Sequence, residues 1–276
     1  MSQKLEVIHP DQLPPVWTSL RAEALRAAKA EPALGSLVNA VVLSHESLGQ
    51  ALSYQLARKL GDMEIRAMTA REVFEDAYAA DPGLVAAAEA DLMAIFERDP
   101  ACKGYLQAFL YFKGFLAIQT YRIAHWLWRQ NRETLAFYMQ SRSSELFQVD
   151  IHPAAKLGRG LFFDHGTGIV IGETAVVGDD VSMLHGVTLG GTGAERGDRH
   201  PKIGKGVLLG AGAKVLGNIE IGDYAKIASG SVVLKPVPAG CTAAGVPARL
   251  VNCRPCSDPA RSMDHTLAEV VYDYVI

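Results

Sequence analysis

The chain has 276 residues, of which 49% are apolar and 21% charged, and its formal net charge is −3. This composition is typical of a globular protein with one or two buried cores, and we expect two domains. The charge balance provides no basic field for nucleic acid or an anionic membrane, so neither is an expected partner. Glu6 and Asp11 interrupt the region where a signal peptide needs an apolar core, and Lys113 interrupts the apolar run 109–118. We therefore predict a cytoplasmic protein.

Residues 15–148 have the composition and the spacing of helices. They are rich in Ala, Leu, Glu, Arg and Gln, and apolar residues recur every three or four positions. One such series is Leu48, Leu52, Leu56 and Leu60. At Asp81 and again at Asp99, an aspartate followed by proline resembles an N-cap with proline at the first helical position, which predicts a helix start. The aromatic-rich segment 105–128 predicts one or two buried helices.

From position 151 onward, apolar residues recur at every sixth position. The thirteen positions are Ile151, Leu157, Phe163, Ile171, Val177, Met183, Leu189, Ile203, Leu209, Val215, Ile221, Ile227 and Val233. A six-residue unit is too short for a helix pair or a propeller blade, so each unit is a short strand with a tight turn, and stacked units form a solenoid of parallel strands. The pattern resembles the hexapeptide repeat of the left-handed parallel β-helix, in which three hexads form a triangular coil. The left hand comes from this resemblance alone, because general crossover preferences are right-handed.

We therefore expect an α+β protein in three parts. These are an α-helical domain over residues 1–149, a left-handed parallel β-helix over residues 150–250 and a flexible C-terminal tail over residues 251–276. Two interruptions break the count of six, and insertions in a solenoid map to loops that carry function. The first is a slip of two residues between Phe163 and Ile171, and the second is an excursion over residues 193–202.

The first interruption contains His165, and Asp150 precedes the first hexad. With eighteen residues to a coil, the two side chains are expected near one corner, where a carboxylate can orient an imidazole that acts as a general base. The alternative is a histidine satisfied by hydrogen bonds of its own turn. His185 is expected to stack on His165 from the next coil, either as a functional pair or only as a side-chain ladder.

The second interruption contains Arg199 and His200 before a proline. Arginine presents a planar fork that matches a carboxylate, and histidine can bind or move a proton, whereas a solvated loop tip is the alternative. A glycine-rich run over residues 190–193 opens this loop and could aim a backbone N–H at an oxyanion. It lacks the strand-to-helix context of a dinucleotide site, which excludes a Rossmann fold.

The four cysteines stand at positions 102, 241, 253 and 256. They are too few and too unevenly spaced for a disulfide framework, which predicts thiols in a reducing compartment. Cys253 and Cys256 resemble half of a zinc site, but only His265 lies near them, so we predict no metal site. The chain ends at Ile276, and a free carboxylate on an apolar residue suits capture by a partner's pocket, although a frayed terminus is the alternative.

Strings in both halves resemble serine O-acetyltransferases, which make O-acetylserine for cysteine synthesis. They lie at residues 99–101, 111–115, 121–128, 147–156, 187–193, 197–203 and 243–249. This resemblance spans about residues 15–250. It is far more specific than the hexad period, which many acyltransferases share.

The resemblance implies a role for each matching residue. His165 is the general base that removes the serine hydroxyl proton, and Asp150 orients it, so that the oxygen attacks acetyl-CoA directly. Arg199 clamps the substrate carboxylate, and His200 contacts the amino acid. Asp99 and Asp164 recognise the ammonium group. The residues implied in contacts with the co-substrate are Gly191, Ala211 and Ala228, and no tightly bound cofactor is implied.

The resemblance also implies partners. Three solenoids form a trimer with the substrates between subunits, and the helical domains pair two trimers into a hexamer. L-Cysteine is the implied feedback inhibitor, bound in the serine site. Ile276 matches the residue that enters the active site of O-acetylserine sulfhydrylase.

Three other functions fit the solenoid less well. A sugar or antibiotic acetyltransferase would have a shorter N-terminal part and no equivalent of Asp99. A hydratase resembling the γ-class carbonic anhydrases needs a close histidine pair for its metal, which His165, His185 and His200 do not provide. A non-catalytic scaffold leaves the combination of Asp150, His165, Arg199 and His200 unexplained.

Overall fold

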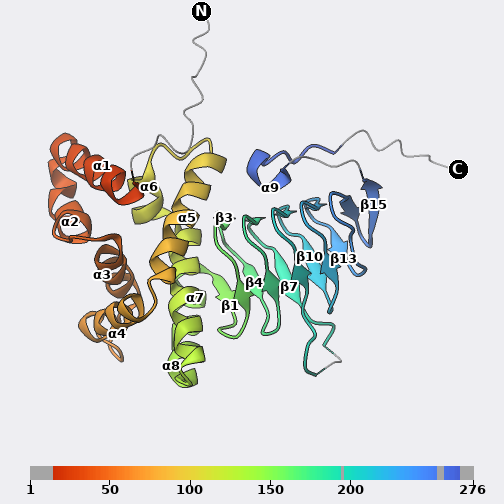
Figure 1. Cartoon of the computed structure of the whole chain (residues 1–276), viewed down its shortest axis with the longest axis horizontal. Coiled ribbons are helices and arrows are strands. Elements are labelled where there is room, and N and C mark those ends of the chain that lie inside the picture. Colours follow the sequence, from red (N-terminus) through yellow and green to blue (C-terminus); the bar gives the residue numbers. More distant parts are fainter. Residues whose placement is uncertain (1–14, 194–195, 254–257, 268–276) are drawn as a thin grey trace, which may run out of the picture.

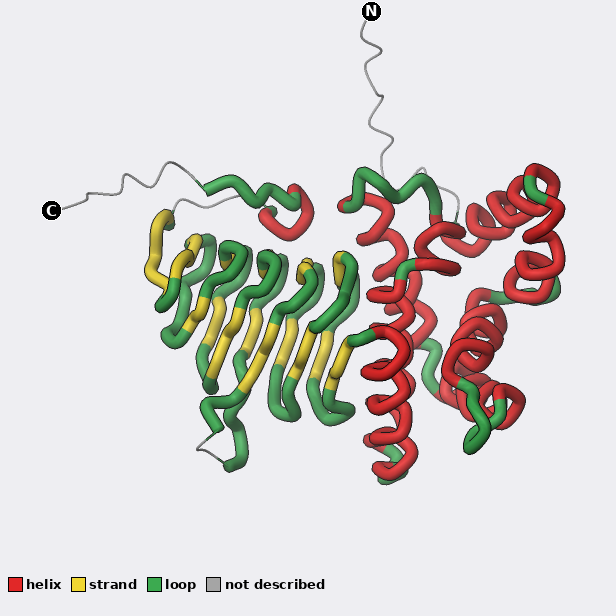
Figure 2. The backbone as a smooth tube through the Cα atoms, turned by 180° about the vertical axis from the view of Figure 1, so that it is seen from behind, coloured by secondary structure: helices red, strands yellow, loops and turns green. Residues whose placement is uncertain are grey.

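The computed structural model describes residues 15–193, 196–253 and 258–267, and it consists of a helical part followed by a coil of strands (Figure 1). The longer helices are α1 (Val16–Ala30), α3 (Leu48–Leu60), α4 (Ala67–Ala80), α5 (Gly83–Arg98), α6 (Tyr105–Tyr111), α7 (Lys113–Arg129) and α8 (Glu133–Phe147). Shorter turns, η2 (Pro32–Leu34), α2 (Gly35–Val38) and η3 (Asn39–Leu43), connect α1 to α3. Helices α5, α7 and α8 lie next to the strands, and α1 to α4 lie farther from them (Figures 1 and 2).

Local sequence explains where these helices form. In α3 the leucines at every fourth position are all buried, and the Ser47 hydroxyl caps the helix by accepting a hydrogen bond from the Gln50 N–H at 3.3 Å. The aromatic segment forms two largely buried helices, α6 and α7, as the sequence predicted.

The prediction that Asp99 starts a helix is wrong. Asp99 follows the last residue of α5 with extended backbone angles, and the next helix begins only at Tyr105. The sequence that follows forms only a turn, closed by a hydrogen bond from the Cys102 N–H to the Asp99 carbonyl at 3.0 Å, and the chain continues without helix up to Gly104. Asp81 likewise follows the end of α4, but there the next helix begins at once, at Gly83.

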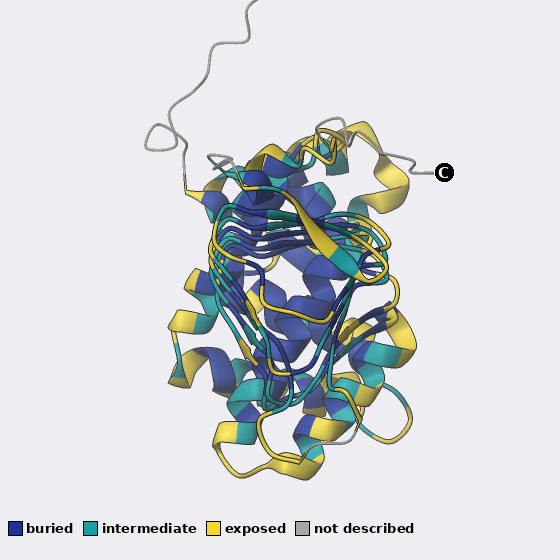
Figure 3. Cartoon of the chain, turned by 90° about the vertical axis from the view of Figure 1, so that its right-hand side faces the viewer, coloured by how far each residue is buried: buried dark blue, intermediate teal, exposed yellow. Residues whose placement is uncertain are grey.

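The strands form three sheets, one on each side of a triangular coil (Figure 3). The first sheet contains β1 (Val149–Ile151), β4 (Ile169–Ile171), β7 (Thr188–Gly190), β10 (Lys214–Leu216) and β13 (Val232–Val233). The second contains β2 (Lys156–Leu157), β5 (Val176–Val177), β8 (Lys202–Ile203) and β11 (Glu220–Ile221). The third contains β3 (Phe162–Asp164), β6 (Ser182–Leu184), β9 (Leu208–Leu209), β12 (Lys226–Ile227), β14 (Thr242–Gly245) and β15 (Ala248–Asn252). We call them the first, second and third sheets.

The register of the strands confirms both interruptions of the repeat. Along the first sheet, Val149 pairs with Ile169, twenty residues on, whereas Val170 pairs with Thr188, eighteen residues on. The two extra residues therefore lie between β3 and β4, at His165. From β7 to β10 the step is twenty-six residues, because the excursion lies between β7 and β8.

The six-residue period positions the core of the solenoid. Of the thirteen apolar positions, all but the half-buried Leu157 are buried inside the coil, because each hexad turns one strand residue inward. All the strand pairs are parallel except the β14–β15 hairpin. The prediction of an α+β protein with a parallel hexapeptide solenoid is confirmed, and the left hand stays a prediction.

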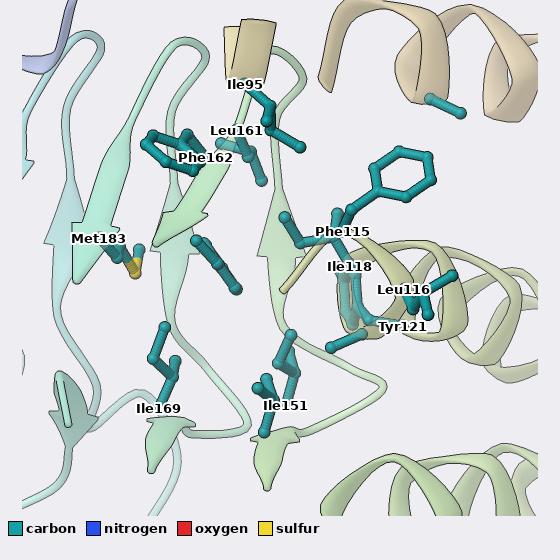
Figure 4. Close-up of a cluster of buried hydrophobic side chains, with 14 of the residues drawn as sticks. Ile95, Phe115, Leu116, Ile118, Tyr121, Ile151, Leu161, Phe162, Ile169 and Met183 are labelled. Carbon is teal, nitrogen blue, oxygen red and sulfur yellow. The ribbon is translucent and has the colours of Figure 1, made fainter. Parts of the chain in front are cut away.

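The helical part and the solenoid share one core. Phe115 and Ile118 of α7 belong to the same buried cluster as Ile151 and Phe162 of the first coil (Figure 4). At Gly114 a Cβ atom would overlap the carbonyl oxygen of Phe163, so only glycine lets the start of α7 approach β3 this closely.

A buried polar seam joins the same two parts. The Asp91 carboxylate, fully buried in α5, accepts hydrogen bonds from the Arg122 guanidinium at 2.7 Å and from the Leu161 N–H at 2.9 Å. Arg122 also donates to the Gly158 carbonyl at 2.9 Å. The seam therefore provides hydrogen-bond partners for the Gly158 carbonyl and the Leu161 N–H, at the corner that leads into β3.

The expectation that the cysteines are all free thiols is wrong for two of them. Cys241 and Cys253 form a disulfide, because the antiparallel pairing of β14 with β15 brings the neighbouring Thr242 and Asn252 together. Cys102 is free and buried, and Cys256 lies outside the described residues. The described C-terminal segment forms the short α9 (Pro259–Ser262) beside α5. Within the described ranges, no helix has the length and apolar character needed to cross a membrane.

Candidate active site

His165 lies at the corner between β3 and β4, where the chain has two residues more than a regular coil. Its backbone has φ of 57°, in the left-handed region, and its side chain is 75% exposed. Nε2 lies 3.7 Å from Oδ1 of Asp164. The ring of His185, one coil further on, packs edge-on at 6.0 Å between centroids, so the predicted stacking of the two imidazoles is confirmed. The corner thus presents an imidazole to solvent.

Two carboxylates face this corner. Burial raises the pKa of Asp164, and the nearby Asp99 carboxylate raises it further, while the two imidazoles oppose the shift. Asp99 is held at the end of α5 because its Oδ1 accepts a hydrogen bond from the Ala101 N–H at 2.8 Å. Two like charges close together are stabilised by a cation between them, so this pair is suited to an ammonium group.

Sequence reasoning missed a cation at the same corner. The Nζ atom of Lys113, the first residue of α7, donates to the Thr167 hydroxyl. Lys113 is in place because Gly114 lets α7 approach this corner. The only sequence signal was that Lys113 lies in a string typical of the family.

Arg199 and His200 lie at a different corner, between the first and second sheets. The Thr174 hydroxyl accepts the backbone N–H groups of both residues, at 3.0 and 3.1 Å. Nδ1 of His200 accepts a hydrogen bond from the Thr174 N–H at 3.1 Å, which leaves the proton of the neutral ring on Nε2. Burial, and then the Arg199 charge, lower the pKa of His200, so the ring is a neutral donor.

Arg199 is not a free solvated residue. Its guanidinium donates to the Glu173 carboxylate at 2.7 Å, and this hydrogen bond lowers the pKa of Glu173. Gly191 lies against the Arg199 side chain, where an added Cβ would be 3.4 Å away. Glu173 and Thr174 were missed by the sequence prediction, because their role depends on the register between successive coils.

Asp150 lies on β1 and is half-buried. Its Oδ1 accepts a hydrogen bond from the Gln140 side-chain amide at 2.6 Å. Among the described residues of one chain, no hydrogen bond or ion pair connects Asp150 with His165. The structure therefore brings Asp164 to the imidazole and leaves Asp150 on the neighbouring sheet.

The residues predicted to contact the co-substrate, Ala211 and Ala228, lie at the same corner as His165 on later coils. The Gly212 N–H donates to the His185 carbonyl and the Gly230 N–H to the Ala211 carbonyl, both at 2.8 Å. Ala211 thus stacks above His185, and Ala228 opens the same corner one coil further on. Ile276 lies outside the described residues. Within those residues, no three His, Cys, Asp or Glu side chains gather where they could hold a metal ion.

A parallel solenoid of hexads, with an exposed imidazole at one corner and a loop-borne arginine at another, defines the class of hexapeptide-repeat acyltransferases. The family model described as "Bacterial transferase hexapeptide (six repeats)" matches residues 200–235, and "Serine acetyltransferase, N-terminal" matches residues 16–120. Serine acetyltransferase of Escherichia coli (strain K12) is 57% identical over 255 residues, which are 92% of this chain and 93% of that protein.

Solved structures of serine acetyltransferases have the same fold as this chain over most of its length. A serine acetyltransferase in complex with cysteine has a TM-score of 0.90 and 53% identity, over 92% of this chain and 98% of that one. The enzyme of Brucella abortus strain S19, in complex with coenzyme A, has a TM-score of 0.87 and 52% identity, over 91% and 100%. The chain belongs to the serine acetyltransferase family. The family resemblance read from the sequence is confirmed.

Proposed function

We propose that this enzyme transfers the acetyl group of acetyl-CoA to the hydroxyl of L-serine by direct attack, with His165 as the general base. The observation that carries the proposal is the exposed imidazole at the slip corner, flanked by the Asp164 and Asp99 carboxylates, in a chain of this family. Asp150 orients the base and stabilises its protonated form.

Each step balances. His165 accepts the serine hydroxyl proton as the oxygen attacks the thioester carbonyl carbon, which forms a tetrahedral oxyanion. The Gly191 N–H donates to that oxyanion. When the C–S bond breaks, the CoA sulfur takes the proton back from His165, which leaves O-acetyl-L-serine and CoA. No acyl-enzyme forms in this direct attack, because the serine oxygen itself attacks the thioester.

The charged groups of serine match side chains of opposite charge at the two corners. The Arg199 fork binds the carboxylate, and Glu173 holds that fork in place until the substrate arrives. His200 donates from Nε2 to the amino acid. Asp99 and Asp164 bind the ammonium group, whose charge relieves their mutual repulsion.

The two sets of groups lie on different corners of the triangle. His165 is at the corner between the third and first sheets, and Arg199 is at the corner between the first and second sheets. We therefore assign the complete site to the contact between two subunits of a trimer, where one corner of each solenoid meets the other. The helical domains then pair two trimers.

Acetyl-CoA is the co-substrate. Its path follows Ala211 and Ala228, small residues that let an extended ligand lie along the corner above His165 and His185. The coenzyme A complex of the Brucella abortus relative supports this binding. A cytoplasmic location stays a prediction of the composition.

An acceptor comparison tests the function. We expect thiol release from acetyl-CoA with L-serine, and little with homoserine, a galactoside or no acceptor. L-Cysteine carries the same carboxylate and ammonium groups as serine, so it should inhibit competitively against serine, and the cysteine complex of a relative supports this. Release with the galactoside and none with serine would identify a sugar acetyltransferase instead.

The C-terminal residue suggests a protein partner. We propose that Ile276 enters the active site of O-acetylserine sulfhydrylase, because it matches the residue that the family resemblance implies for this contact. Deleting Ile276 should abolish sulfhydrylase binding in a pull-down assay and leave acetyl transfer unchanged. Full binding by the shortened chain would refute the proposal.

A further inference from the structure

Helix α8 runs back along the first strand of the solenoid. Gln148, in the left-handed conformation with φ of 57°, ends the helix and turns the chain directly into β1. The Ser143 hydroxyl donates to the Val149 carbonyl at 3.1 Å. Gln140, three residues earlier and so on the same helix face, reaches the next residue of the strand, Asp150. The helix therefore fixes both the backbone and one side chain of β1.

The bond between Gln140 and Asp150 has a defined direction. An ionised carboxylate only accepts hydrogen bonds, so it is the amide NH₂ group of Gln140 that faces Oδ1, at 2.6 Å. In the part of the chain that the structure describes, no other hydrogen bond reaches the Asp150 carboxylate. One oxygen is thus held by a neutral donor. The other accepts no hydrogen bond within the described residues, and under the proposed function it is the oxygen available to the His165 imidazole.

We propose that Gln140 is a positioning residue for the acetyl-transfer reaction, which holds the Asp150 carboxylate in the orientation that His165 requires. This inference rests on the proposed function. A neutral amide suits the task, because it orients the carboxylate without neutralising it. A lysine would compete with the imidazolium for the negative charge, and an acid would repel it.

Gln140→Glu gives the sharpest test, because the two side chains have nearly the same shape. The introduced carboxyl group would face Asp150 with like charge when it is ionised, whereas its protonated form donates as the amide does. We expect kcat of the variant to fall about tenfold or more below that of the unaltered enzyme near pH 8.5 and to recover to within about threefold near pH 6.

The deciding quantity is the ratio of kcat between Gln140→Glu and the unaltered enzyme across pH, measured at saturating serine and acetyl-CoA. A ratio that rises toward low pH supports the inference, and a flat or falling ratio overturns it. A merely structural role would not produce this dependence. Gln50→Glu on α3 is the matched control, because it makes the same change at an exposed site, and its ratio should stay flat.

Two further variants separate this inference from the proposed function. Gln140→Leu removes the donor and should lower kcat at every pH, with KM for acetyl-CoA unchanged. If Asp150→Asn keeps full activity, the proposed role of Asp150 fails. If Asp150→Asn is inactive while the Gln140→Glu ratio is flat, only the role of Gln140 fails.

Discussion

Replacing His165 by alanine should lower kcat by about 10²- to 10⁴-fold, the usual contribution of a general base. The loss should be specific to chemistry, because the side chain is 75% exposed and contributes little to packing. Thermal unfolding and coenzyme A binding should therefore stay unchanged. His265→Ala, at an exposed histidine of the C-terminal segment, is the control and should keep full turnover.

Mixing subunits tests whether the site spans two chains. We would unfold and refold the variants His165→Ala and Arg199→Ala together, each inactive by itself. If His165 and Arg199 meet from different subunits, random assembly restores about a quarter of the sites, those with an intact residue from each neighbour. If they meet within one chain, every site lacks one of the two groups, and the mixture stays inactive.

Replacing Asp91 by alanine should have the largest effect on stability. Asp91 is fully buried and Arg122 is 7% exposed, so the variant leaves a buried guanidinium without its charge partner and the Leu161 N–H without its acceptor. Breaking a buried pair in this way costs about 3–5 kcal/mol. Thermal unfolding should shift down by about 10 °C, because 1 kcal/mol corresponds to a few degrees in a chain of this size.

Two variants test whether burial, rather than the ion pair itself, causes the loss of stability in Asp91→Ala. Arg71→Met breaks a surface pair with Glu75 that has the same N–O distance of 2.7 Å, and it should cost no more than about 1 kcal/mol. The double variant Asp91→Leu with Arg122→Met removes both buried charges and should recover part of the stability. An unfolding temperature of Asp91→Ala equal to that of Arg71→Met would contradict the role of the seam.

The two loops that carry the candidate site residues could be predicted from the sequence, but the residues that hold those side chains in place could not. The breaks in the period of six located His165 and the Arg199 loop, because a strand register is set by counting residues. Thr174 and Glu173 could not be assigned, since they act on a loop about twenty-five residues away in the chain. The bonds of Gln140 to Asp150 and of Asp91 to Leu161 likewise leave no local pattern, because they join a helix to the solenoid.

Two predictions were wrong because the same local sequence pattern is compatible with two different structures. An aspartate before a proline can begin one helix or end another, and at Asp99 it ends α5. The cysteine count argued against a disulfide, but the hairpin pairing of β14 with β15 brings Cys241 to Cys253. In both cases the neighbouring elements decided between the alternatives.

The sequence by itself determined the helices, the solenoid and the two corners that carry the candidate chemistry, because apolar periodicity dictates which residues turn inward and a break in it forces a loop outward. Only the tertiary structure decided which side chains contact one another at those corners. It pairs Asp164 with His165, buries His200 as a neutral donor and ties Asp150 to Gln140. These depend on the distances between side chains that packing fixes and spacing along the chain does not.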